Sequence, residues 1–540
     1  MSCKISTFSR PMELDPARHK SLRLPWDILM ELLPYTISYE PGSRLFRGTL
    51  SRLMQTCRTL YFKGIPLLLQ GEIILPTWES IYSFSDFILL SDPHESQRRA
   101  DLIRWMYIPI SPKDGINIIK GWPEVFNLDT YARDRFSHLL ELTRNVERLH
   151  FATLEIFMDP TPPHLLDADP DMLDMPDCPF TDNMMELSRL TELQVDEMGA
   201  LGEGLVNQLY SAPLAVVSLT WDWYRKRAAL LNNISNLLYP YIHTLTTLSI
   251  NDSNSWFMLP DDDFPGNQVF HNVHTLNLTG GTCDFLAESI MHTLPNLKHL
   301  TWNCRDQPDD STLPRDERDR LMNMNGIDDR GEGWGWEVLE TFRCCIRGAF
   351  TLGLMCKVNA WDAEVLTPDR INQLQEVLTE SQVDHLKLLV LMDRFTDLEV
   401  RRIFDVGDEQ MFDNITLKRL DITFVWSFGL EKDMLGDDVM DAIVNCLSRL
   451  PSLEHLNFSI SDYTGTRFLE TRHTRDLAQR FAETLPQLRN MTLHCHGECE
   501  GYSLPIKGWK VAEINGWKIV EEVDPTEMLD GPLRTYNKRA

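Results

Sequence analysis

The sequence predicts an α/β solenoid, in which short strands and helices alternate and stack along one direction. Three observations predict it. A short hydrophobic phrase returns along the chain, its second half alternates between polar and apolar residues, and helix-like segments that stop at a proline separate several copies. Because solenoids present long surfaces to partners, binding is the function that we expect of such a chain.

The recurring phrase is a hydrophobic residue, two variable residues, a leucine-like residue, one polar residue and another hydrophobic residue. About eleven copies are enough for a continuous core. In Leu276-Asn277-Leu278-Thr279 the alternation predicts a strand with one apolar and one polar face. Clear copies begin at Leu190, Leu245, Val273, Leu297, Leu417, Leu453 and Leu488, and weaker ones at Val146, Val216, Leu339 and Val383.

Between the phrases, residues 285–294, 441–450 and 476–485 have apolar residues at helical spacing, and a proline follows each segment. The leucine positions of neighbouring phrases lie 24 residues apart from Leu276 to Leu300, and 36 apart from Leu420 to Leu456. Tetratricopeptide arrays need two helices and no strand in each unit. The chain instead resembles irregular leucine-rich repeats that loops have lengthened, and the resemblance implies a horseshoe over residues 141–520.

Several segments depart from the repeat. We expect loop insertions near residues 159–182 and 304–336, the second ending in tryptophans that either pack on the neighbouring repeat, which we favour, or dock a partner. Asn515-Gly516 between two strand-like runs predicts a hairpin that caps the array. We expect a helical connector over residues 71–140 and flexible tails over residues 1–20 and 521–540.

Charge and composition limit the partners. The chain has 540 residues, with 52 Lys+Arg against 80 Asp+Glu, so its formal net charge is −28. This balance argues against nucleic acid and anionic membranes as partners, and leaves either a solubility role for the acidic surface or a basic partner. No apolar run is long enough for a signal peptide or a membrane span, and the 11 cysteines are scattered. These features favour a cytoplasmic or nuclear protein.

Residues 21–70 do not follow the repeat. Two helical apolar stripes are predicted there, the first around Ile28 and Leu29 and the second around Leu53 and Cys57. The segments Leu24-Pro25-x-Asp27-Ile28-Leu29 and Leu53-Met54-x-x-Cys57-Arg58-x-Leu60 resemble an F-box, and an F-box followed by leucine-rich repeats resembles many fungal proteins of that family. The alternative is a helical cap of the solenoid without an adaptor. The resemblance implies contacts to the Skp-type adaptor of a cullin-RING ubiquitin ligase from Leu24, Pro25, Ile28, Leu29, Leu53 and Cys57.

No pattern in the sequence predicts chemistry. The best metal candidate is His494-Cys495-His496 with Cys499. The strand alternation places His494 and His496 on one face and Cys495 on the other. With Cys499 this leaves three donors, fewer than a closed structural zinc site needs. Cys344 and Cys345 are expected on opposite faces, one buried and one exposed. No nucleophile motif is present. We therefore expect no catalytic residue, no metal and no cofactor.

The expected function is that of a substrate-recognition subunit of a cullin-RING ligase. Its F-box would bind the Skp-type adaptor, which joins the cullin scaffold, and its repeats would bind a protein substrate that the sequence does not identify. The alternative is a leucine-rich-repeat scaffold or inhibitor with no ligase connection. The candidate substrate-binding residues are Asp196, Asp222, Asn251, Asn277, Thr279, Asn303, Asp421, Thr423, Asn457 and Ser459.

Overall fold

The computed structural model describes residues 58–89, 93–110, 125–158, 179–221, 234–251, 268–279, 287–303, 335–392, 412, 415–426, 437–462, 474–497, 507–514 and 517–523. The candidate adaptor-binding residues, the expected N-terminal tail and most of both expected insertions lie outside these ranges. The chain divides into two compact units. Unit 1 comprises residues 1–231 and 237–245, and unit 2 comprises residues 232–236 and 246–540.

Five strands of unit 1 pair side by side in chain order, and every pair is parallel. The pairing register joins equivalent phrase positions, so that Met106, Leu149, Leu193 and Val217 form one buried row. The strands are β1 (Glu72–Ile74), β2 (Trp105–Ile108), β3 (Arg148–Thr153), β4 (Glu192–Met198) and β5 (Val216–Trp221).

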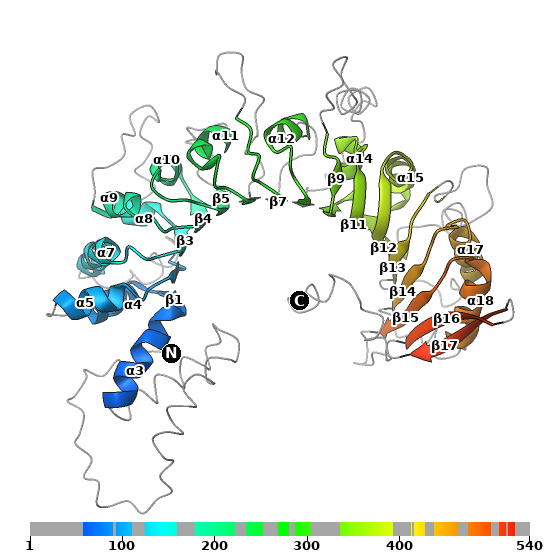
Figure 1. Cartoon of the computed structure of the whole chain (residues 1–540), viewed down its shortest axis with the longest axis horizontal. Helices are drawn as coiled ribbons and strands as arrows, with labels where there is room; N and C mark the ends of the chain where they lie inside the picture. Colours follow the sequence, from blue (N-terminus) through cyan, green and yellow to red (C-terminus); the bar gives the residue numbers. More distant parts are fainter. Residues whose placement is uncertain are drawn as a thin grey trace, which may run out of the picture. The chain divides into compact units, whose positions relative to one another are not determined.

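Apart from the first, the helices of unit 1 lie along one side of these strands (Figure 1). An aromatic cluster joins the two layers, because the ring of Phe157 lies 5.2 Å from that of Phe136 and 5.7 Å from that of Phe151, centroid to centroid. The helices are α3 (Arg58–Gln70), α4 (Trp78–Ile88), α5 (Pro93–Ala100), α7 (Val125–Leu142), α8 (Glu155–Met158), α9 (Pro179–Met185), α10 (Ala200–Gln208) and the 3-10 turn η4 (Tyr239–Tyr241), with α11 (Ile234–Leu237) where the chain division falls.

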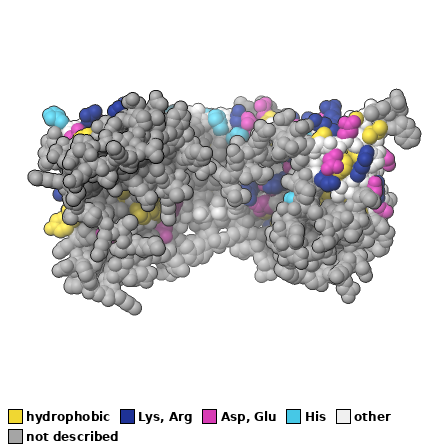
Figure 2. Space-filling model, turned by 90° about the horizontal axis from the view of Figure 1, so that it is seen from below, with side chains coloured by type: hydrophobic (Ala, Val, Ile, Leu, Met, Phe, Trp, Pro, Cys, Tyr) yellow, Lys and Arg dark blue, Asp and Glu magenta, His cyan; other side chains and the backbone are white. Residues whose placement is uncertain are grey.

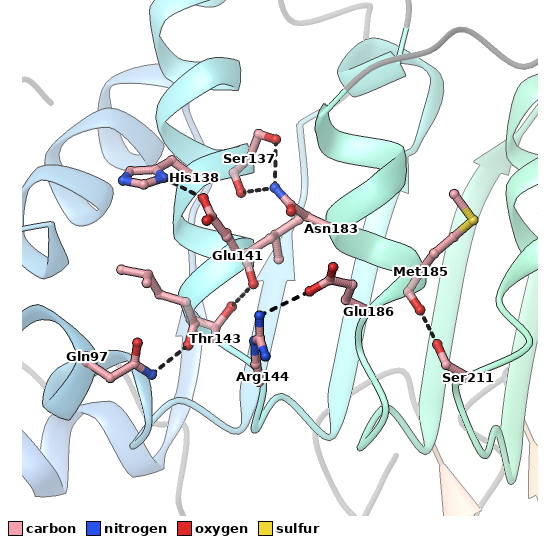
Figure 3. A network of polar contacts seen from close by, with 12 residues as sticks. Gln97, Ser137, His138, Glu141, Thr143, Arg144, Asn183, Met185, Glu186 and Ser211 are labelled. Carbon is pink, nitrogen blue, oxygen red and sulfur yellow. Dashed lines mark hydrogen bonds and ion pairs between the residues drawn. The ribbon is translucent and has the colours of Figure 1, made fainter.

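Polar contacts connect neighbouring helices of unit 1 at their ends (Figure 3). The amide of Asn183 in α9 donates a hydrogen bond of 2.8 Å to the carbonyl of Ser137 in α7. Arg144, just after α7, forms an ion pair of 3.2 Å with Glu186, just after α9. These contacts fix the helix of one repeat against the helix of the next.

Unit 2 has the same arrangement, and its strands between residues 357 and 497 are longer, with 8–10 residues each. Its parallel pairing joins nine phrases in register, through a buried row of Leu248, Leu276, Leu300, Phe342, Trp361, Leu386, Leu420, Leu456 and Met491. The strands are β6 (Thr247–Asn251), β7 (Thr275–Thr279), β8 (His299–Asn303), β9 (Val338–Leu339), β10 (Thr341–Cys344), β11 (Lys357–Leu366), β12 (Gln382–Leu391), β13 (Arg419–Trp426), β14 (His455–Asp462), β15 (Asn490–Gly497), β16 (Lys507–Ile514) and β17 (Trp517–Val523).

Helices of unit 2 lie on one side of its strands (Figure 1). The three helices predicted to precede prolines are confirmed as α12 (Ala287–Thr293), α17 (Asp437–Leu447) and α18 (Thr474–Thr484). The other helical segments are α14 (Ile346–Leu352), η5 (Pro368–Arg370) and α15 (Ile371–Glu380).

A repeated backbone contact explains why two variable residues follow the first hydrophobic residue of the phrase. The backbone carbonyl of the first variable residue accepts two hydrogen bonds. They come from the backbone N–H groups of the two variable residues in the next copy of the phrase. The His274 carbonyl accepts from Lys298 and His299 at 2.9 Å each, and the Lys418 carbonyl accepts from Glu454 and His455 at 2.8 and 3.0 Å. Since only the backbone takes part, the side chains at these positions are free to vary.

The C-terminal hairpin is confirmed, since β16 and β17 pair antiparallel and β16 pairs antiparallel with β15. Three details differ from expectation. The segment 71–140 contributes the strands β1 and β2 in addition to helices, β11 is a repeat strand that we did not expect, and β17 extends to Val523 instead of ending by residue 520.

The described residues thus form an open α/β architecture in which thirteen α-helices accompany a mostly parallel sheet with an antiparallel end. None of the described helices is long and apolar enough to cross a membrane.

Candidate binding surface

The strand faces divide as the alternation predicts. In β7 the side chains of Leu276 and Leu278 are buried while Asn277 is partly exposed and Thr279 exposed, and β8 follows the same pattern. We call the partly exposed side of the strands the polar face of each unit. Among the described residues, each paired strand contributes side chains to this face, so we take it as the candidate binding surface.

Most predicted substrate-binding residues lie on this face. In unit 2 the register places Asn251, Thr279 and Asn303 in one row. It also places Asp421 opposite Asn457, and Thr423 opposite Ser459. Asn277 donates a hydrogen bond of 3.0 Å to Ser249 on the neighbouring strand. Asp196 lies on β4 of unit 1, and Asp222 lies outside the described residues.

In unit 2, Asp421 is the centre of a charged cluster. Its Oδ2 lies 3.0 Å from Nε2 of His385 on β12, and its Oδ1 lies 3.2 Å from Nε of Arg419 on its own strand. Burial acts to raise the pKa of Asp421, but the hydrogen bond from His385 and the charges of His385 and Arg419 outweigh it and lower that pKa below its usual value. Asp421 is therefore an ionised, largely buried acceptor whose position both neighbours fix.

The next strand extends the cluster. Nδ1 of His455 lies 3.2 Å from the amide nitrogen of Asn490 on β15. Burial and the nearby charge of Arg419 lower the pKa of His455, so its neutral form is favoured and Nδ1 can accept the amide hydrogen bond. Thr492 donates a hydrogen bond of 2.6 Å to Asn457 in the adjacent row.

Most carboxylates on and beside the unit 2 strands have cationic partners on a neighbouring strand. Asp362 on β11 pairs with Lys387 on β12 at 3.0 Å. Asp384 accepts from Lys357 at 2.9 Å and from Lys418 at 3.0 Å, which joins three successive repeats. In the space-filling view, Lys and Arg side chains lie next to Asp and Glu side chains over the described part at the right (Figure 2). The charges of these repeats are thus largely balanced locally.

β11 carries an irregularity on this surface. Its register with β12 shifts between Asp362 and Val365, as in a β-bulge, and Glu364 within the shift has a φ of 58°. Burial raises the pKa of Glu364, while Arg343, 3.6 Å away, opposes that rise. The bulge turns a partly buried carboxylate toward β10.

In unit 1 the polar face is aromatic and acidic. The ring of Tyr107 on β2 stacks on His150 of β3, with centroids 4.1 Å apart and an interplanar angle of 15°. Nε2 of His150 lies 2.7 Å from Oδ2 of Asp196, and the Gln194 amide donates to Oδ1 of Asp196 at 2.9 Å. Burial acts to raise the pKa of Asp196, and the hydrogen bonds from His150 and Gln194 lower it overall, so Asp196 is an ionised group.

A second row runs beside the first. The guanidinium of Arg148 on β3 lies 5.5 Å from the ring centre of Trp105 on β2, and its Nε forms an ion pair of 3.2 Å with Glu192 on β4. The register places Trp105 opposite Arg148 and Arg148 opposite Glu192. Aromatic, cationic and anionic side chains therefore follow one another across β2, β3 and β4.

Sequence reasoning missed these unit 1 residues, with the exception of Asp196, although the signal was present. Ile103-Arg-Trp-Met106-Tyr-Ile108 has the spacing of the repeat phrase, with methionine in the leucine position. The same holds for Val358-Asn-Ala-Trp361-Asp-Ala363, where tryptophan takes that position. A search for the phrase that admits any large apolar residue would have found β2 and β11.

The isolated motifs have structural contacts. Cys344 is buried, and Sγ of Cys345 accepts a hydrogen bond from the Gly348 N–H at the start of α14. Trp336 is buried and donates a hydrogen bond of 2.9 Å to the carbonyl of Leu294, as expected for packing on the neighbouring repeat, while Trp334 lies outside the described part.

Among the described residues, no group of three or more His, Cys, Asp and Glu side chains is arranged to hold a metal ion. The side chains of Cys495 and His496, and the whole of Cys499, lie outside those residues. In comparisons with known proteins, no family model matches the chain and no curated protein matches it.

Proposed function

We propose that this chain is a leucine-rich-repeat protein that serves as the substrate-recognition subunit of a cullin-RING ubiquitin ligase. The repeats form a solenoid whose polar face holds a protein substrate, and the segment from Leu24 to Leu60 acts as an F-box that binds the Skp-type adaptor. The chain itself performs no chemistry and contributes proximity and orientation to the transfer.

The observation that supports the proposal most directly is the in-register stacking of the phrase. In unit 2, the nine strands β6–β8 and β10–β15 place the leucine position of the phrase in one buried row. Stacking of this kind leaves an extended polar face, as partner-binding repeat proteins require. The F-box part depends on the sequence resemblance alone.

The test uses the full chain and a purified Skp-type adaptor. We expect a stable complex in size-exclusion chromatography, and we expect Leu29→Asp combined with Leu53→Asp to abolish it, because adaptor docking buries apolar side chains. The matched control is Tyr210→Asp with Tyr239→Asp, which places the same charges on exposed side chains of unit 1 (71% and 55% exposed) and leaves binding unchanged.

The outcome separates the proposal from its rival. No complex with the adaptor, or a complex that the Leu29→Asp and Leu53→Asp changes leave intact, would favour a scaffold or inhibitor without a ligase connection. The circular dichroism of each variant is compared with that of the unchanged chain, so that loss of folding is not mistaken for loss of binding.

A further inference from the structure

The carboxylates on the polar face of unit 1 exceed its cations. Three carboxylates lie on this face among the described residues of β1–β5: Glu72 on β1, and Glu192 and Asp196 on β4. The described strands contribute one fully charged cation to it, Arg148. Arg148 pairs with Glu192, and His150 and Gln194 bind Asp196. The side chain of Glu72 makes no hydrogen bond or ion pair with the other described residues. The described residues of this face therefore carry more negative than positive charge, in contrast to the balanced strands β11–β15.

The surplus charge surrounds aromatic rings. Burial raises the pKa of Tyr107, and the negative charges of Asp196 and then Glu72 raise it further, so both carboxylates lie close enough to act on its hydroxyl. Trp105, in register with Glu72, already receives a guanidinium over its ring from Arg148. Flat rings beside ionised carboxylates provide the two contacts that a guanidinium favours, stacking and charge-assisted hydrogen bonds.

The carboxylates of this surface are also exposed enough to contact a partner. The side chains of Asp196 and Glu192 are 38% and 37% exposed, so their remaining lone pairs are open to solvent. Their positions are fixed by contacts across the strands, which lowers the entropic cost of binding.

We infer that the polar face of unit 1 binds a cationic segment of a partner protein, with arginine side chains preferred over lysine. The inference rests on the proposal that the polar face holds the substrate, and it names the chemistry of that substrate. It does not depend on the adaptor. Its test uses the chain alone, so its failure and a failure of adaptor binding are distinguishable.

The experiment is a fluorescence-anisotropy titration of the full chain with labelled peptides at about 0.15 M salt, where non-specific attraction is screened. The probes are (Arg-Ser)6, (Lys-Ser)6 and (Glu-Ser)6. We expect the arginine peptide to bind most tightly and the glutamate peptide not to bind. Glu72→Gln with Asp196→Asn should weaken binding of the arginine peptide about tenfold or more, because charge-assisted hydrogen bonds are lost.

The matched control is Asp441→Asn with Glu483→Gln, which removes one Asp and one Glu charge from the helices α17 and α18 of unit 2, away from the polar face, and should change the affinity less than about twofold. Trp105→Leu should reduce the preference for arginine over lysine. Equal weakening in both double variants would show that the net charge alone attracts the peptide, and would overturn the inference. So would the absence of binding, or tighter binding of (Lys-Ser)6. If Glu72→Gln with Asp196→Asn unfolds, Glu72→Lys alone replaces it, with the same expected loss.

Discussion

His385 and Asp421 meet diagonally across β12 and β13, with Nε2 of the imidazole 3.0 Å from Oδ2 of the carboxylate. His385 is in direct register with Arg419, which contacts the same carboxylate from its own strand. An ionised carboxylate can only accept hydrogen bonds, so the contact requires the proton of His385 on Nε2. Asp421 therefore connects two neighbouring strands, because its buried charge is stabilised by His385 on β12 and by Arg419 on β13 together.

This contact predicts that the free energy of unfolding decreases at acidic pH. The folded pKa of Asp421 lies below its unfolded value, which is about 3.9. The stabilisation is therefore complete above the unfolded pKa and is lost as the pH falls through the folded pKa. At pH 7 we expect Asp421→Asn to lower the free energy of unfolding by roughly 1–3 kcal/mol, and to make urea unfolding less steeply dependent on pH below about 4.

The control for Asp421 is Asp362→Asn. Asp362 also faces a cation across neighbouring strands, but Lys387 in this pair is 59% exposed. Water screens such a pair, so its loss should cost about 0–1 kcal/mol. Equal losses in the two variants, measured in the same titration, would contradict the role given to the His385 contact.

His455 predicts a second pH dependence at a higher pH. Its folded pKa lies below the unfolded value of about 6.5, because of burial and then the charge of Arg419. The unfolded chain therefore binds the proton more readily, so stability is complete above the unfolded pKa and falls as the pH drops below it. We expect His455→Gln, which cannot titrate, to flatten urea unfolding midpoints between pH 7 and pH 5. A slope that survives this change would assign the effect to another group.

Gly202 in α10 predicts a steric limit in unit 1. A Cβ atom at this position would lie 2.8 Å from Oε1 of Glu155 and 3.0 Å from Cγ of Met198. The same Glu155 oxygen accepts hydrogen bonds from the N–H groups of Gly199 and Gly202 at 2.5 and 3.0 Å, at the start of α10. Gly202→Ala should displace this buried carboxylate and lower the thermal midpoint, at a cost of about 1–3 kcal/mol.

Gly71 is the matched glycine. An added Cβ there would meet only the carbonyl oxygen of Leu68, at 4.0 Å. We expect Gly71→Ala to leave the thermal midpoint unchanged or to raise it slightly, because it restricts the unfolded chain. If both glycine variants unfold at the same temperature, the close packing of Glu155 on Gly202 is not important for stability.

Much of this architecture was predictable because its causes are local. The helices before Pro295, Pro451 and Pro486 are predicted by apolar residues at helical spacing and by the proline that ends each segment. The strand β11 was missed because Trp361 takes the leucine position of its phrase, and because α14, before it, ends at Gly353 with a φ of 54° and not at a proline. The contacts between side chains on the polar face were not predictable. The contact of His385 with Asp421, for example, depends on which strands are neighbours and on their register.

Lys518 predicts how the C-terminal hairpin is held. Its Nζ donates to the carbonyls of Leu485 and Pro486, just beyond α18, at 2.5 and 2.6 Å, and the amide of Gln479 in α18 donates to the Lys518 carbonyl at 2.7 Å. A lysine at the end of a helix satisfies carbonyls that have no partner within the helix, and it complements the helix dipole. The hairpin is thereby tied to the last helix as well as to β15.

We expect Lys518→Met to loosen β16 and β17, since it keeps the length of the side chain but removes the donor. Hydrogen exchange should accelerate in β17 and remain unchanged in β12 and β13, because loss of the cap acts on the end of the sheet. The control is Lys507→Met, which removes an ion pair of 3.6 Å with the more exposed Glu522 and should change exchange little. Faster exchange throughout unit 2, or none in β17, would show that the hairpin is not held as a cap by Lys518.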